Sequence, residues 1–279
     1  MMKTSSATID LSHPRGFEIT ALAALFVLTL RQHLRGRRLW VLMLLFLLPS
    51  LLVVLVRLTN RPPPPEHLEF AFVFNLIPHV LATLTALLYA AGIIQDEIEE
   101  QTLTYLLIRP LPRWALYLTK LAVTIVVTST ITAAFTALAY IVIYWNTDKL
   151  WGEVLTERVP KAAALFALAQ VGYCSLFGAV SMLTRRSLIA GLAYIVAFEG
   201  ILANFASVVR QLTVMFYFRV LAVRWLNPAD SKGWSIDLDT APSALSCVEI
   251  LLVASLAFAV IGAALMVGRE FRVKTPEGS

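Results

Sequence analysis

The sequence predicts an all-α polytopic membrane protein: six transmembrane helices preceded by an N-terminal elbow helix at the membrane interface. Hydrophobic residues make up 58% of the 279 residues and charged residues only 15%, and the mean hydropathy is +0.76. Soluble globular chains do not have such a composition. The apolar residues also fall into runs of about 20 or more, the length that crosses the hydrocarbon core of a bilayer. We therefore expect residues 1–279 to form a single transmembrane domain.

The six expected spans are residues 39–58, 70–94, 114–144, 161–183, 188–208 and 244–268. A polar tail, 1–16, precedes the elbow helix, 17–38, and a second tail, 269–279, follows the last span. The apolar part of the elbow, 17–30, is too short to span comfortably, and arginines follow it, which favours a helix lying along the interface. The alternative is a tilted, partly buried helix with no mechanical role.

The third expected span is longer than a bilayer requires. Its beginning carries four residues that we interpret as an anchor at the inner interface, namely Arg113, Trp114, Tyr117 and Lys120. Tyr144 and Trp145 at its other end are typical of the outer aromatic belt.

The connection 206–243 is too apolar for a simple loop, although Arg210, Arg219 and Arg224 interrupt it. It is expected to contain a re-entrant or interfacial helix on the outer side. The alternative is a seventh span, which would place Arg219 in mid-membrane and is energetically expensive.

The distribution of Lys and Arg predicts cytoplasmic N- and C-termini in a multi-pass protein of the cell (inner) membrane. Of the 23 basic residues, fourteen fall in segments that this topology places inside. The other nine fall in outside segments: Arg57, Arg61, Lys149, Arg158, Lys161, Arg210, Arg219, Arg224 and Lys232. Basic residues favour the cytoplasmic side. Because they cluster at span ends, we do not expect a nucleic-acid partner.

The segment 96–113 separates the second and third spans. It opens with four carboxylates in five residues, so the apolar run is expected to end before Asp96. Leu103, Leu106 and Leu107 then follow the spacing of a short helix with one apolar face. Thr102 is its expected N-cap, and Pro110 stops it. A short amphipathic helix at the water face is well placed to be pushed by a soluble partner.

This segment resembles the corresponding loop of type-2 ABC transporter permeases. In that family the loop has glutamates, Gly-Thr, a leucine-rich helix and a Pro-x-x-Arg sequence before the third span. The matching residues here are Glu97, Glu99, Glu100, Thr102, Leu103, Leu106, Leu107, Pro110 and Arg113. Gln101 stands where the family usually has glycine.

The resemblance implies a permease subunit of an ABC transporter, in which the loop docks on a separate cytoplasmic ATP-binding subunit. The residues implied in ATPase coupling are Glu97, Glu100, Thr102, Leu103, Leu106, Arg109, Pro110 and Arg113. Two copies of the ATPase and a second permease, identical or different, complete the expected complex in the lipid bilayer. The chain contains no phosphate-binding G-x-x-x-x-G-K-[ST] loop, so we expect ATP hydrolysis on the partner chain, no enzymatic activity here and no cofactor.

Polar residues inside the spans are the candidates for a translocation path, because burying them in the membrane is costly. Glu199 lies about twelve residues into the fifth span, and similar permeases often carry a glutamate near this place. Asn75 and His79 share a face around Pro78. For these two, satisfaction of carbonyls freed by a proline kink is an alternative without a ligand.

Two other functions remain open from the sequence. One is a polytopic intramembrane enzyme that uses Glu199 and His79, although no clustered nucleophile, base or metal ligands occur and no metal is expected. The other is a passive membrane anchor that recruits a cytoplasmic complex through residues 96–113. We favour an ATP-driven exporter, whose substrate the sequence does not name.

Overall fold

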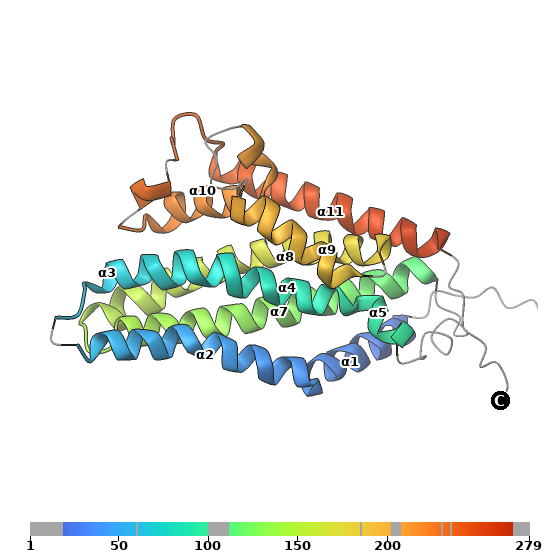
Figure 1. Cartoon of the computed structure of the whole chain (residues 1–279), viewed down its shortest axis with the longest axis horizontal. Helices are drawn as coiled ribbons and strands as arrows, with labels where there is room; N and C mark the ends of the chain where they lie inside the picture. Colours follow the sequence, from blue (N-terminus) through green and yellow to red (C-terminus); the bar gives the residue numbers. More distant parts are fainter. Residues whose placement is uncertain are drawn as a thin grey trace, which may run out of the picture.

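The computed structural model describes residues 19–59, 61–99, 112–184, 186–201, 208–229, 231–234 and 236–269. Within these ranges all regular structure is helical, and the long helices run side by side along the longest axis of the molecule (Figure 1). The core follows α8, which makes its most extensive contacts with α7 and α11. An all-α membrane fold is therefore confirmed.

Among the described residues, five helical stretches are long and apolar enough to cross a membrane. They are α2 (Arg37–Arg57), the Pro65–Glu97 stretch, α7 (Arg113–Ile143), the Leu150–Leu183 stretch and α11 (Ala244–Gly268). The second stretch comprises α3 (Pro65–Leu68), η1 (Glu69–Ala82), α4 (Thr83–Ala90) and α5 (Gly92–Glu99). The fourth comprises η2 (Leu150–Arg158) and α8 (Val159–Leu183). The third span is long as expected, with 31 residues.

Of the fifth expected span, 188–208, the structure describes residues 188–201 and 208. The structure has α9 (Ser187–Tyr194) and the π-helix η3 (Ile195–Ile201), which together are shorter than a span. After residues 202–207, which lie outside the described ranges, come the 3-10 turn η5 (Val208–Leu212) and α10 (Val214–Leu226). The expected helix within 206–243 is therefore present as α10, and the 3-10 turn η6 (Ser231–Trp234) follows it.

Hydrogen bonds define the two ends of the bundle. At one end Arg269 donates to the Met182 carbonyl at 2.7 Å, which places the ends of α11 and α8 together. At the other end Arg57 donates to the Trp145 carbonyl at 2.6 Å. We call the first the α1 end and the second the α3 end; they lie at the right and left of Figure 1.

The N-terminal segment forms a separate helix, α1 (Ile19–Arg35), which a break at Gly36 divides from α2. Gly36 has an extended conformation, with φ −68° and ψ 146°, which interrupts the helical hydrogen-bond pattern. α1 packs mainly on α7. The expected elbow is therefore a distinct helix, and its position relative to the membrane stays a prediction.

Two sequence expectations need correction at the α1 end. The helix of the second span does not end before the carboxylates, because α5 continues through Asp96 and Glu97 to Glu99. Tyr117 and Lys120 are not interfacial anchors, since both are buried inside the bundle. Glu97 and Lys120 neutralise each other within the protein, which explains why α5 can continue through the carboxylates and why Lys120 can be buried.

Candidate functional site

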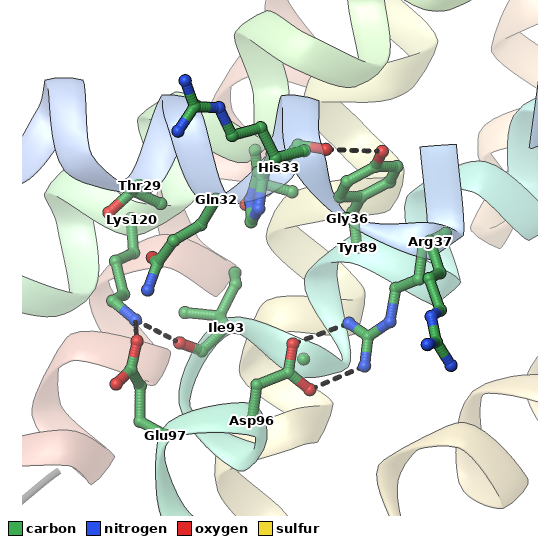
Figure 2. Close-up of a pocket in the computed structure, with 14 residues that line it drawn as sticks. Thr29, Gln32, His33, Gly36, Arg37, Tyr89, Ile93, Asp96, Glu97 and Lys120 are labelled. Atoms are coloured by element: carbon green, nitrogen blue, oxygen red, sulfur yellow. Dashed lines mark hydrogen bonds and ion pairs between the residues drawn. The ribbon is translucent and has the colours of Figure 1, made fainter. Parts of the chain in front are cut away.

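The candidate site lies at the α1 end, where α5 leaves the bundle toward residues 100–111. Two ion pairs hold α5 there (Figure 2). Arg38 donates to both carboxylate oxygens of Asp96 at 2.6 and 2.7 Å. Lys120 donates to Glu97 at 2.5 Å and to the Ile93 carbonyl at 3.3 Å. The last turns of α5 are thus tied to the start of α2 on one side and to α7 on the other.

The Lys120–Glu97 pair is the more deeply placed of the two. Its side chains are 5% and 6% exposed, whereas those of Arg38 and Asp96 are 44% and 35% exposed. Removing one member of a buried pair leaves an uncompensated charge, which costs far more than breaking an exposed pair. Lys120–Glu97 is therefore a rigid connection between α5 and α7.

His33 joins α1 to the same site. Its Nε2 lies 3.1 Å from Oγ1 of Thr124 on α7, and its ring meets Tyr89 edge-on at a centroid distance of 4.9 Å. Burial lowers the pKa of His33 from 6.5 to about 4, with smaller contributions from the positive charges of Lys120 and Arg38. The ring is therefore neutral at pH 7 and forms part of the α1–α7 contact.

These residues surround a cavity of about 440 Å³. Thr29, Gln32 and His33 line it from α1, Ile93, Asp96 and Glu97 from α5, and Lys120 and Thr124 from α7. Figure 2 shows both ion pairs among the lining residues, with the Gln32 amide drawn near Lys120.

The predicted coupling residues are only partly described. Glu97 is in the buried pair with Lys120, and Arg113 is exposed and donates to the Arg269 carbonyl at 3.4 Å. The remaining members lie outside the described residues: Glu100, Thr102, Leu103, Leu106, Arg109 and Pro110. The predicted helix 102–109 therefore stays a prediction.

Sequence reasoning missed the partners of α5. Asp96 was read only as part of a charged loop, and Lys120 only as an anchor. A usable signal was present, because Lys120 lies well inside an apolar helix, where a lone cation requires an anionic partner. The nearest acids in the sequence are those of 96–100.

Glu199 has a definite role in the described structure. It is 2% exposed and accepts hydrogen bonds from the Val214 and Met215 amides, each at 3.3 Å. The Tyr194 hydroxyl donates a third, also at 3.3 Å. Val214 and Met215 open α10, so the Glu199 carboxylate lies at the positive end of that helix dipole. It joins the end of η3 to the beginning of α10.

Asn75 and His79 lie in η1, around Pro78 as expected. His79 donates from Nδ1 to the Asn75 carbonyl at 2.8 Å, and its Nε2 accepts from Arg219 at 2.7 Å. The Asn75 amide donates to the Phe70 carbonyl at 2.9 Å, and its oxygen accepts from Trp234 at 3.2 Å. These bonds fit the alternative without a ligand. Among the described contacts, His79 and Glu199 share no hydrogen bond.

A third buried acid, Glu69, was not singled out from the sequence. It is 1% exposed and accepts from the Tyr140 hydroxyl at 2.9 Å, from Tyr144 and from Arg158 at 2.8 and 2.9 Å. This cluster joins η1, the end of α7 and η2 at the α3 end. Its Arg158 ends the helix η2, a segment that the sequence predicts to be a loop between spans.

The described residues contain no group of three or more His, Cys, Asp or Glu side chains that could hold a metal ion. Cys174 and Cys247 are both free and buried. The arrangement at the α1 end is therefore one of charge pairs and packing contacts between helices.

Comparison with known proteins bears on this arrangement. A search of curated proteins finds no match to the chain. A family model described as "ABC-2 family transporter protein" matches residues 23–267, which is most of the chain and includes α2 through nearly all of α11. Together with the apolar helices, this match shows a membrane permease component of an ABC transporter. The chain therefore belongs to the ABC-2 transporter family.

Proposed function

We propose that this chain is the permease subunit of an ATP-driven exporter and that residues 96–113 receive the movement of a separate ATP-binding subunit. The observation that carries the proposal is the attachment of α5 to α7 through the buried Lys120–Glu97 pair. A force on the segment after α5 would be transmitted to both α5 and α7, because separating the two buried charges costs a large free energy.

We further propose that the polypeptide chain crosses the membrane in six passes, with α9, η3 and α10 together forming the fifth. α9 begins at the α1 end, where the Ser187 hydroxyl donates to the Ala91 carbonyl at 3.3 Å. α10 lies toward the α3 end, where Arg219 contacts His79 of η1. The Glu199 carboxylate bridges the two halves, which supports a broken span.

In this topology the α1 end is cytoplasmic, both termini lie inside, and α1 is the interfacial elbow of a protein in the cell (inner) membrane. Two ATP-binding subunits and a second permease copy would complete the transporter. Closure of the ATPases would push residues 102–109, move α5 with α7, and shut the inner part of the path while the outer part opens. Glu199, Asn75 and His79 border that outer part.

The test uses the substitution Leu106→Asp in the full chain, purified by a tag from its native membranes. The wild-type protein should copurify with ATP-hydrolysing activity, and the charge on the proposed docking face should remove that activity. Expression and insertion should not change, since the position is predicted to lie in water. As the matched control, Leu183→Asp places the same charge on the exposed end of α8 and should retain the ATPase.

Full ATPase activity with Leu106→Asp would contradict the docking assignment. The same purification separates the alternatives, because a passive anchor or an intramembrane enzyme would not make hydrolysis by a bound ATPase depend on this chain.

A further inference from the structure

We propose that the cavity at the α1 end binds the phosphate headgroup of an anionic phospholipid, whose acyl chains lie along the exposed apolar face of α2. This goes beyond the proposed function. Lipid binding would hold without any ATPase, and only the assignment to the inner leaflet rests on the proposed topology.

The size and the composition of the cavity fit a headgroup. Its volume of about 440 Å³ falls in the range of about 300–1,000 Å³ that small-molecule sites occupy. Most of its lining residues have polar or charged side chains, and they come from α1, α2, α4, α5 and α7. The charged side chains among them suit a charged headgroup.

Among the described residues, the lining carries an excess of positive charge. Four cations, Arg35, Arg37, Arg38 and Lys120, face two carboxylates, Asp96 and Glu97. Arg38 and Lys120 are matched by these carboxylates. Arg35 and Arg37 make no ion pair with the described residues, and neutral His33 adds no charge. The walls therefore attract an anion without requiring either existing pair to break.

Two further donors point to the same ligand. The Thr29 side chain is 1% exposed and lines the cavity, and its hydroxyl has no hydrogen-bond partner among the described residues. A buried polar group without a partner is costly, so a ligand acceptor would satisfy it. α2 also begins at the cavity, with Gly36 as an N-cap that offers no side-chain hydrogen bond. The Leu39 amide donates to the Gly36 carbonyl, which leaves the amide of Arg37 and the positive end of the α2 dipole available to an anion.

The surface beside the cavity distinguishes a lipid from free phosphate. Directly after the arginines, α2 exposes Trp40 by 72%, Val41 by 62% and Leu44 by 69%. A basic group followed by an exposed tryptophan and leucines is the pattern of a helix that enters a bilayer through its headgroup region. A headgroup in the cavity would thus have its acyl chains against an apolar helix face.

The experiment measures thermal unfolding of the purified, delipidated full chain in detergent, with dioleoyl phosphatidylglycerol or dioleoyl phosphatidylcholine added in equal amounts. Native mass spectrometry counts the bound lipids in parallel. We expect phosphatidylglycerol to raise the Tm and to be retained, and phosphatidylcholine to do neither. The double variant R35Q/R37Q should lower phosphatidylglycerol affinity by at least about tenfold, because each basic residue near a membrane surface adds on the order of 1 kcal/mol.

The matched control is R31Q, which removes an arginine from the same helix outside the cavity lining and should bind as the wild type does. T29V removes the unpartnered hydroxyl at nearly constant volume, so it should keep the fold and weaken phosphatidylglycerol binding. Equal stabilisation by both lipids, or equal loss in R31Q and R35Q/R37Q, would overturn the proposal. So would an equal Tm shift with soluble glycerol phosphate, which would mean an anion site and not a lipid site.

Because this measurement contains only the permease, its failure would leave the ATPase test unaffected. Conversely, loss of the ATPase in Leu106→Asp says nothing about the cavity.

Discussion

At the residue scale, the three buried acids of the described chain are compensated in three different ways. Glu97 faces one lysine, and Glu69 faces an arginine and two tyrosines. Glu199 is held by two backbone amides and one hydroxyl. Removing one charge of a close buried ion pair leaves its counter-charge in a low-dielectric site, whereas a carboxylate held by several dipoles loses them one at a time. The Lys120–Glu97 pair should therefore be the most sensitive to single substitutions.

We predict that Lys120→Met lowers the free energy of unfolding by about 3–5 kcal/mol, because it leaves Glu97 charged and buried. Glu97→Gln should have a smaller effect of the same sign. The double variant should recover most of the loss, since both charges are then gone. Unfolding of the four proteins in detergent gives the coupling energy of the pair. A double variant as unstable as the sum of the single variants would show that the pair does not act as a unit.

His33 predicts a dependence of stability on pH. Its pKa in the folded chain, about 4, lies below the ordinary 6.5, so the unfolded chain takes up the proton first. The stabilisation is complete above pH 6.5 and is lost as the pH falls from 6.5 toward 4, by on the order of 2–3 kcal/mol. We expect the Tm of His33→Gln to fall less over this range than that of the wild type. The control is His67→Gln, because His67 is exposed. The Tm of this variant should fall over the same pH range as much as that of the wild type does.

At the element scale, the long apolar helices could be predicted because hydropathy and length are local properties of the sequence. The contacts of Lys120 could not, because its partner Glu97 lies 23 residues away and belongs to another helix. The partners of Glu199 were also beyond local reasoning, because its carboxylate accepts from the amides of Val214 and Met215, which open a different helix. For residues 100–111, which lie outside the described ranges, the helix 102–109 stays a prediction from the sequence.

The joint between η3 and α10 gives a prediction for Glu199. Glu199→Gln keeps one oxygen that can accept from Val214 or Met215, but it loses the charge at the helix N-terminus; Glu199→Leu loses all acceptors. Exchange of the Val214 and Met215 amides with deuterium should therefore rise modestly in the Gln variant and strongly in the Leu variant, and transport should fall in the same order. Unchanged amide exchange in Glu199→Leu would show that the carboxylate does not stabilise the contact between η3 and α10.

At the scale of the whole molecule, the proposal requires the chain to return to its starting side, which takes an even number of passes. In the part of the chain that the structure describes, five helical stretches are long enough to span alone. The native cysteines Cys174 and Cys247 are both buried, with 0% exposure, so single introduced cysteines should report their positions against a low background. The positions needed are exposed ones at opposite ends of the bundle. Asp148 and Lys232 serve at the α3 end and Arg186 at the α1 end.

We predict that a membrane-impermeant maleimide labels Asp148→Cys and Lys232→Cys in intact cells. Arg186→Cys should react only after the membrane is opened, and reporters fused after Ser279 or inserted near Gln101 should both report cytoplasm. Arg224, near the end of α10, donates hydrogen bonds to the Leu238 and Ala241 carbonyls in the loop that precedes α11. Because α10 therefore ends beside the start of α11, we expect α9, η3 and α10 together to complete one pass. If Lys232→Cys reacted only after permeabilisation while Asp148→Cys reacted in intact cells, the α9–α10 segment would enter and leave on one side. The C-terminus would then lie outside, and a single span would be missing from the proposed transporter.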